Sequence, residues 1–113
     1  MMSETALDAK KWSKCISDSR GLSELLKDRI FLKEKVEYAT MIYKKKPVSP
    51  LYLVGTLANV LEADERVMDA VERIPNCSDT TTRRIILHWY AILVYLASRE
   101  FGLIVTDIQK GGQ

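Results

Sequence analysis

The chain has 113 residues, close to the commonest size of a single domain, so a second domain would have too few residues for a core of its own. Hydrophobic residues make up 47% of it and charged residues 28%, which excludes a disordered tail and indicates a globular protein. Its 17 Lys and Arg residues exceed its 15 Asp and Glu residues only slightly, so the net charge of +2 does not by itself indicate binding to nucleic acid or to a membrane.

Glycine and proline are scarce, with five and three residues respectively. So few turn-forming residues disfavour a many-stranded β sandwich or barrel and favour long helices with short connections. We therefore predict an all-α protein. It is expected to form one helical domain over residues 1–113, a compact bundle of four or five helices with a central, apolar C-terminal helix.

The two cysteines, Cys15 and Cys77, form no CxxC pair, and the chain has a single histidine. A zinc site therefore lacks its usual ligands. The chain also has no Gly-rich phosphate loop, Walker-type lysine motif or metalloprotease signature, so we expect neither a metal nor another cofactor. The N-terminal segment lacks the apolar stretch of a secretory signal, and we expect a cytoplasmic protein with no membrane partner.

A weakly amphipathic helix is predicted over residues 3–17. Leu7, Trp12 and Ile16 recur there at near-helical spacing, with lysines between them. The Gly21 that follows marks a break in the chain before the next helix.

A longer helix is predicted over residues 23–46, with Ser23 as its N-cap. One apolar stripe runs along it at helical spacing: Leu25, Leu32, Val36, Ala39 and Tyr43. Further apolar residues widen this stripe, so we expect the helix to contact two neighbours. These residues are Ile30, Phe31, Met41 and Ile42.

A third helix is predicted from Pro50 to Ile74. Ser49 as N-cap and Pro50 at the first helical position are a favoured start, because the amide that proline lacks would have no partner there. Asp64 interrupts the apolar seam of this helix. Either one helix runs through Asp64, or Asp64 is the N-cap of a second, short helix. We predict the continuous helix, because no glycine or proline marks a break.

The last helix is predicted over residues 83–101, after a loop in which Ser78 or Asp79 is the N-cap. Its apolar run, residues 85–97, is too short to span a bilayer of about 30 Å. A helix that is apolar on every side lies at the centre of a bundle, or partly in the face of an oligomer. Gly102 is placed to end it in the left-handed conformation.

The start of this last helix carries Arg83, His88 and Tyr90 in the pattern R-x4-H-x-Y. The pattern resembles the motif of HEPN ribonucleases, small all-helical domains that include many toxins of prokaryotic defence systems. The resemblance implies that Arg83 and His88 meet across a dimer interface and cleave RNA without a metal, with the 2′-hydroxyl attacking the adjacent phosphate. An imidazole moves protons near neutral pH and a guanidinium clamps phosphate, which suits this chemistry.

A structural role for the same residues is the interpretation that we favour. We predict that His88 packs in the core with one ring nitrogen hydrogen-bonded, and that Tyr90 is a core or interface aromatic. A buried Asp64 must be paired. Its expected partner is one of three residues: Arg83, Arg84 or His88.

The first 48 residues carry more Lys and Arg than Asp and Glu. Six lysines in this part of the chain are candidates for contacts with the phosphate backbone of RNA or DNA: Lys10, Lys11, Lys14, Lys44, Lys45 and Lys46. Such contacts hold a nucleic acid without reading its bases.

Together these features predict a non-catalytic helical module for interaction or assembly. We expect a homo-oligomer or a protein partner, with the chain either self-associating or forming a small subunit of a larger complex. A nucleoprotein complex held through the lysines is one form of the latter. The alternative is a HEPN-like, metal-independent endoribonuclease with Arg83, His88 and Tyr90 as its catalytic residues.

Overall fold

The computed structural model describes residues 8–42, 49–75, 77 and 79–104. This part of the chain contains six α-helices and no strand, which confirms the all-α prediction. The count exceeds the predicted four or five because two of the predicted helices are each divided in two. The helices are α2 (Ala9–Asp18), α3 (Arg20–Leu25), α4 (Arg29–Ile42), α5 (Pro50–Glu62), α6 (Glu65–Glu72) and α7 (Thr80–Glu100).

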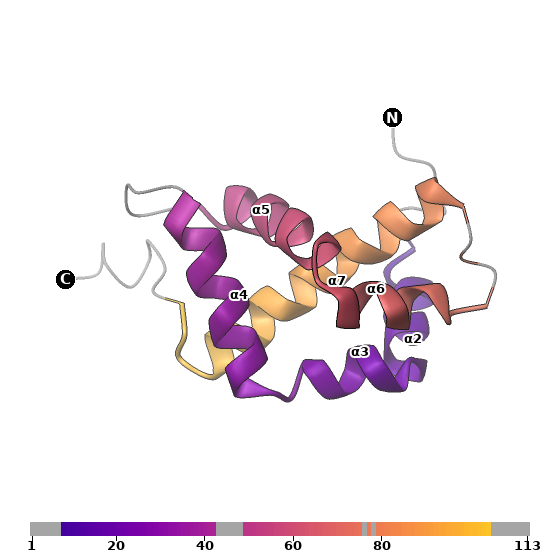
Figure 1. The fold of residues 1–113 in the computed structure, drawn as a ribbon, viewed down its shortest axis with the longest axis horizontal. Helices are drawn as coiled ribbons and strands as arrows, with labels where there is room; N and C mark the ends of the chain where they lie inside the picture. Colours follow the sequence, from indigo (N-terminus) through magenta and orange to yellow (C-terminus); the bar gives the residue numbers. More distant parts are fainter. Residues whose placement is uncertain (1–7, 43–48, 76, 78, 105–113) are drawn as a thin grey trace.

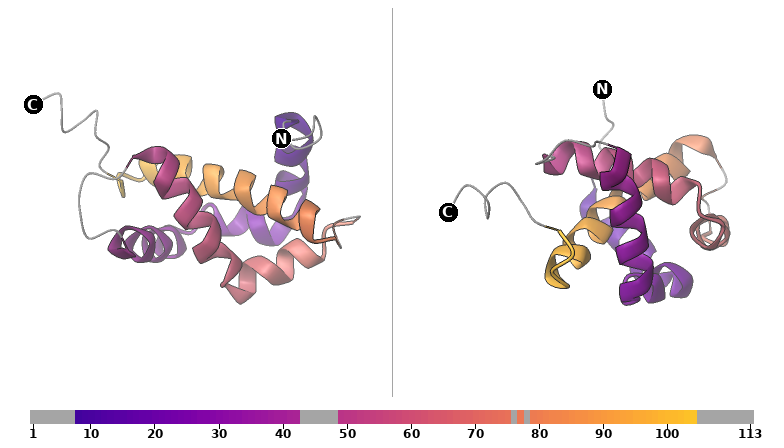
Figure 2. Two further views of the ribbon diagram at one scale, coloured as in Figure 1. Left: turned by 90° about the horizontal axis from the view of Figure 1, so that it is seen from above. Right: turned by 60° about the vertical axis from the view of Figure 1, so that its left-hand side comes forward.

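Helix α7 lies at the centre of the fold, as predicted. It crosses the molecule diagonally and packs against α5, α4 and α2 (Figure 1). Figure 2 shows α2 standing beside the first half of α7, away from α4. Seven side chains of α7 are buried: Ile86, Leu87, Tyr90, Ala91, Val94, Tyr95 and Ser98. None of the described helices, α7 included, has both the length and the apolar character that crossing a bilayer requires.

Helix α7 begins at Thr80, three residues before the predicted start at residue 83, and Asp79 is the one of the two predicted N-caps that is observed. The Asp79 carboxylate accepts hydrogen bonds from the backbone N–H and the hydroxyl of Thr82, at 2.6 and 2.9 Å, and so caps the helix. At the other end Gly102 adopts a φ of 74°. The N–H of Leu103 donates to the carbonyl of Ser98 at 2.8 Å, which completes a Schellman motif.

Helix α2 overlaps the first predicted helix and ends one residue beyond it, at Asp18. Asp8 is its N-cap and accepts a hydrogen bond from the backbone N–H of Lys11 at 3.1 Å. Trp12 and Ile16, the expected apolar face, are both buried in the core. Residues 3–7 of the prediction lie outside the described residues.

The predicted start of the second helix at Ser23 was wrong. Helix α3 begins at Arg20, because the Ser19 hydroxyl accepts a hydrogen bond from the backbone N–H of Leu22 and caps it. The Ser23 hydroxyl instead donates to the carbonyl of Ser17 at 2.9 Å, back toward the end of α2.

A turn then divides the helix predicted over residues 23–46. Asp28 accepts hydrogen bonds from the backbone N–H groups of Ile30 and Phe31, at 3.0 and 3.2 Å, and so starts a new helix, α4. Helix α4 packs against α5 and α7, the two neighbours that the wide apolar stripe predicted. Residues 43–46 lie outside the described part of the chain.

The continuous helix predicted from Pro50 to Ile74 was wrong, although its start is confirmed. The Ser49 hydroxyl accepts a hydrogen bond from the N–H of Tyr52, and Pro50 takes the first helical position. Helix α5 ends at Glu62, and α6 begins directly after Asp64. The alternative in which Asp64 is an N-cap is therefore the observed one.

Candidate functional site

Of the three residues of the R-x4-H-x-Y pattern, His88 leaves α7 on a different side from Arg83 and Tyr90. Successive helical residues are rotated by about 100°, so His88 lies about 140° from Arg83 and about 160° from Tyr90 around the helix axis. In agreement, Tyr90 is fully buried, Arg83 is half-buried and His88 is exposed. One copy of the chain therefore does not bring the three side chains to a single site.

Tyr90 joins α7 to α3 inside the core. Its hydroxyl donates a hydrogen bond to the backbone carbonyl of Leu22 at 2.8 Å. Burial raises the pKa of Tyr90, and the nearby carboxylate of Asp64 raises it further, so the phenol stays neutral and acts as a donor. Tyr90 takes the position of the core aromatic that we favoured from the sequence.

Arg83 joins α7 to α6. Its Nη1 lies 3.8 Å from Oε2 of Glu72, in an ion pair whose side chains are 32% and 59% exposed. An ion pair this exposed contributes little to stability. It does, however, orient the Arg83 side chain toward α6, whereas Arg84 beside it is exposed.

His88 is on the surface of α7, so the prediction of a histidine packed in the core was wrong. Its ring makes an edge contact with Trp89, the two ring centroids being 6.3 Å apart at an interplanar angle of 74°. Arg84, one helical turn earlier, is also exposed. Arg84 and His88 thus lie on the same exposed face of α7, one helical turn apart.

Asp64 is the centre of the main buried charge cluster in the described chain. Its Oδ1 accepts hydrogen bonds from the backbone N–H groups of Arg66 and Val67, at 2.8 and 3.2 Å. Its Oδ2 pairs with Lys35 Nζ at 2.6 Å and with Arg66 Nη2 at 2.9 Å. The Asp64 and Lys35 side chains are only 6% and 12% exposed. The partners expected from the sequence were wrong: Arg83, Arg84 and His88.

These contacts explain both the break before α6 and the charge state of Asp64. Burial by itself would raise the pKa of this carboxyl group. Hydrogen bonds from Arg66, Lys35 and Val67 outweigh burial, and together they hold the pKa of Asp64 well below its usual range. The ionised carboxylate therefore caps α6 and links it to α4 through Lys35.

This lowered pKa predicts a loss of stability in acid. Because the pKa of Asp64 is lower in the folded than in the unfolded chain, its contribution is fully present above the unfolded value of about 3.9. The contribution falls as the pH drops below that value toward the folded pKa. Urea unfolding of the wild type and of Asp64→Asn between pH 7 and pH 3 measures it. The stability gap between the two proteins should narrow as the pH falls, and a constant gap would contradict the assignment.

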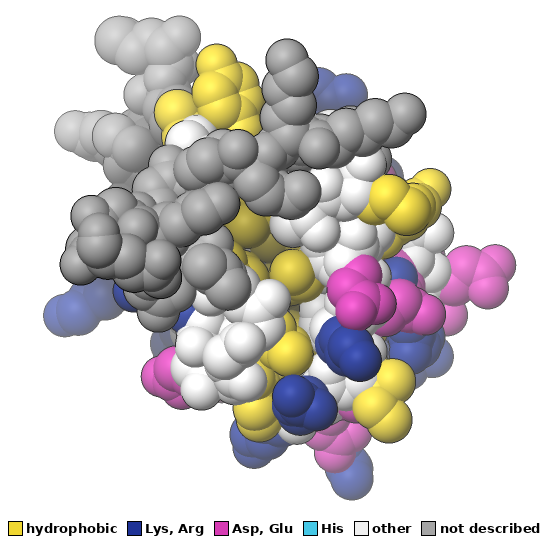
Figure 3. All heavy atoms as spheres, turned by 90° about the vertical axis from the view of Figure 1, so that its left-hand side faces the viewer, with side chains coloured by type: hydrophobic (Ala, Val, Ile, Leu, Met, Phe, Trp, Pro, Cys, Tyr) yellow, Lys and Arg dark blue, Asp and Glu magenta, His cyan; other side chains and the backbone are white. Residues whose placement is uncertain are grey.

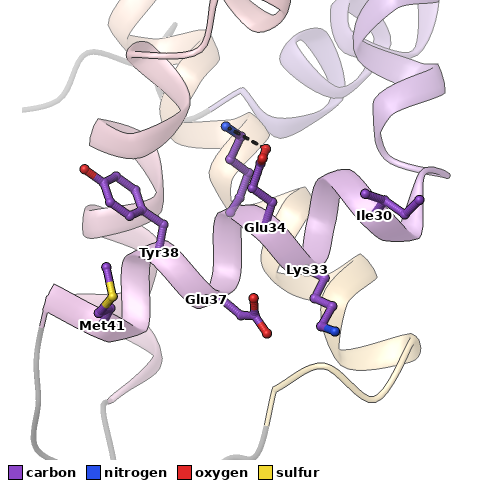
Figure 4. A pocket seen from close by; sticks show the side chains of 7 residues that line it. Ile30, Lys33, Glu34, Glu37, Tyr38 and Met41 are labelled. Carbon is purple, nitrogen blue, oxygen red and sulfur yellow. Dashed lines mark ion pairs between the residues drawn. The ribbon is translucent and has the colours of Figure 1, made fainter.

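A second candidate site is the outer face of α4, which we call the α4 surface: Ile30, Lys33, Glu34, Glu37, Tyr38 and Met41. These residues line a shallow groove along the helix (Figure 4). In Figure 4, Ile30 lies at one end of the groove and Tyr38 and Met41 at the other, with the acidic and basic side chains between them.

Sequence reasoning missed the α4 surface. It treated Ile30 and Met41 as part of the face that contacts neighbouring helices, but both are exposed, whereas Phe31 is buried. It also attributed an oligomer face to the apolar excess of the last helix. Most of that excess lies in the core, and Leu96 is the large apolar side chain that α7 exposes.

The structure describes three of the six candidate lysines. Lys10, Lys11 and Lys14 are exposed on α2. Lys14 pairs with Asp18 at 3.0 Å, and Lys11 Nζ lies 4.7 Å from the centre of the Trp12 ring. The other candidates lie outside the described residues: Lys44, Lys45 and Lys46.

The two cysteines are free thiols, Cys77 within the core cluster and Cys15 packed against it. Cys77 is buried and Cys15 half-buried, and burial raises the pKa of Cys77. Among the described residues, no three His, Cys, Asp or Glu side chains gather in a way that would hold a metal ion.

Comparisons with protein-family models, with curated protein sequences and with solved structures gave no significant match to this chain. Its function therefore has to follow from its own residues and surfaces.

Proposed function

We propose that this protein is a non-catalytic helical interaction module that self-associates or joins a larger assembly through the α4 surface. The observation that carries the proposal is the exposure of large apolar side chains on one side of one helix. Ile30 is 82% exposed, Tyr38 54% and Met41 63%. Their spacing of eight and three residues places all three on the same face of α4.

The start of α5 also exposes large apolar side chains. Leu51 and Tyr52 are 76% and 65% exposed, and α4 ends where α5 begins, at the same end of the molecule (Figure 1). Figure 3 faces that end and shows hydrophobic side chains exposed between charged ones. Apolar patches of this kind on a protein surface mark interaction sites, and fully burying one such side chain contributes about 1.5 to 3 kcal/mol.

The double variant Ile30→Asp with Met41→Asp tests this proposal. Both side chains are exposed, so the variant should keep the helical circular dichroism of the wild type. It should lose self-association in sedimentation, or lose a protein that the wild type captures from cells. Leu96→Asp, an exposed apolar position on α7, is the matched control. A wild type that stays strictly monomeric and captures no partner would contradict the proposal.

The exposed lysines of α2 support the nucleoprotein form of this assembly. Replacing Lys10, Lys11 and Lys14 by Gln should weaken binding to RNA or DNA uniformly across sequences. It should also reduce the slope of log affinity against log salt by roughly one for each phosphate that is no longer neutralised. Lys27→Gln, at an exposed lysine in the turn between α3 and α4, is the control. Binding that does not depend on salt would reject this form.

The second candidate function, a metal-independent endoribonuclease, is supported by the exposure of His88. In this case a second copy would have to supply the arginine, because Arg83 and His88 diverge within one chain. Cleavage of single-stranded RNA in the presence of a chelator should then be lost in His88→Ala and in Arg83→Ala. Arg99→Ala, at an exposed arginine of the same helix, is the control. Unchanged cleavage by His88→Ala would rule this candidate out.

A further inference from the structure

We propose that the α4 surface binds a second copy of this chain, with the two α4 helices antiparallel about a two-fold axis. This inference rests on the proposed function, because it names the partner of the same surface. In a two-fold interface each copy offers the same patch, so the patch must be complementary to itself. The pattern along α4 meets this requirement in its exposed apolar residues and in Lys33 and Glu37.

The charged residues provide the first part of the argument. Glu34 is already balanced within the chain, because its Oε1 lies 3.4 Å from both Lys35 Nζ and Arg66 Nη2. Lys33 and Glu37 have opposite charges, both are exposed, and neither makes an ion pair among the described residues. Figure 4 shows them pointing to the same side of α4, opposite to the Glu34–Lys35 pair.

Antiparallel pairing brings these two charges together across the axis. In antiparallel helices, residues on the same flank of each helix face one another. If Lys33 lies opposite Glu37 of the second copy, the axis passes close to Lys35, and Glu37 in turn lies opposite Lys33 of the second copy. The single pattern thus forms two intermolecular ion pairs.

The same register also matches the apolar residues. With the axis close to Lys35, Ile30 lies between Tyr38 and Met41 of the second copy. The two-fold axis repeats this contact at the other end of the interface. Each of the three exposed apolar side chains is then covered by an apolar neighbour, and no charge is left opposite a like charge at the Lys33 and Glu37 positions.

The size of the surface indicates how tight this dimer should be. Helix α4 has 14 residues and is therefore about 21 Å long. Pairing one helix of this length with its copy buries less than the roughly 1,200 Å² that marks a stable interface. We therefore expect a reversible dimer whose population rises with protein concentration.

Exchanging the charges of Lys33 and Glu37 tests the register. Lys33→Glu and Glu37→Lys should each place two like-charge contacts across the axis and raise the dimer dissociation constant by about 100-fold, tenfold per contact. Mixing these two variants pairs opposite charges at both contacts, so the mixture should form heterodimers although each variant alone is monomeric. The double variant should also regain the wild-type dissociation constant. Sedimentation equilibrium measures the dissociation constants of the two single variants, of their mixture and of the double variant. Lys10→Glu is a control that should leave the dimer unchanged.

Three results would overturn the proposed antiparallel dimer of α4 helices. They are a wild type that remains a 12.9 kDa monomer at every concentration, a dimer indifferent to both charge changes, and a mixture of the single variants that stays monomeric. A monomeric wild type that loses a different protein partner on Ile30→Asp with Met41→Asp would overturn this inference and leave the proposed function standing.

Discussion

Asp64→Ala should lower the free energy of unfolding by about 3 to 5 kcal/mol, the cost of leaving a buried charge without its partner. The substitution removes the carboxylate that Lys35 approaches to 2.6 Å while the Lys35 side chain is only 12% exposed. It also frees the backbone N–H groups of Arg66 and Val67 at the start of α6. Urea or thermal unfolding followed by circular dichroism measures the loss.

Two variants separate the contribution of the buried ion pair from that of the helix cap. Asp64→Asn keeps an oxygen that can cap α6 but removes the charge, so it should cost less than Asp64→Ala. Asp79→Ala removes the cap of α7 at an exposed position and should cost about 1 kcal/mol. If Asp64→Ala costs no more than Asp79→Ala, the pairing with Lys35 contributes nothing to stability.

The elements that could be predicted are those whose signals are local. Ser49 with Pro50 starts α5, Asp79 caps α7 and Gly102 ends it, as their positions in the sequence indicate. Each of these residues acts on the backbone within a few residues of itself, through a hydrogen bond or through its own allowed φ. Such effects require no knowledge of the rest of the fold.

The breaks at Asp28 and Asp64 were harder to predict because a carboxylate does not by itself end a helix. Aspartate is tolerated within an exposed helix face and also favoured as an N-cap, and the surroundings decide between the two. At Asp64 the deciding partner is Lys35, which lies in another helix. The apolar pattern continued at helical spacing on either side of Asp64, and its single interruption at Asp64 was compatible with both a continuous helix and a break.

The candidate sites depend on which faces of a helix are covered, which no local pattern specifies. Ile30 and Phe31 are neighbours of similar hydropathy, yet Ile30 is exposed and Phe31 buried. On α7 the same uncertainty applied to His88 and Tyr90. These residues are two positions apart, so they lie on nearly opposite sides of the helix. Only the packing of α4, α5 and α2 around α7 determines which of them faces solvent.

Tyr90→Ala should lower the free energy of unfolding by about 3 to 5 kcal/mol, because it removes a fully buried aromatic ring from the centre of the core. Tyr90→Phe should cost only about 1 kcal/mol. The Leu22 carbonyl that loses the hydroxyl still accepts a hydrogen bond from the N–H of Leu26 at 3.3 Å, so it is not left without a partner.

The Tyr90→Phe variant also separates the structural role of this residue from a catalytic one. It stays folded under assay conditions, so any RNA cleavage by the wild type should persist in it at nearly the wild-type rate. A hydroxyl that donates to a backbone carbonyl inside the core cannot reach a phosphate outside it without unfolding of α3 from α7. Loss of cleavage in a folded Tyr90→Phe protein would show that this hydroxyl acts on RNA, and that the hydrogen bond between Tyr90 and Leu22 opens during the reaction.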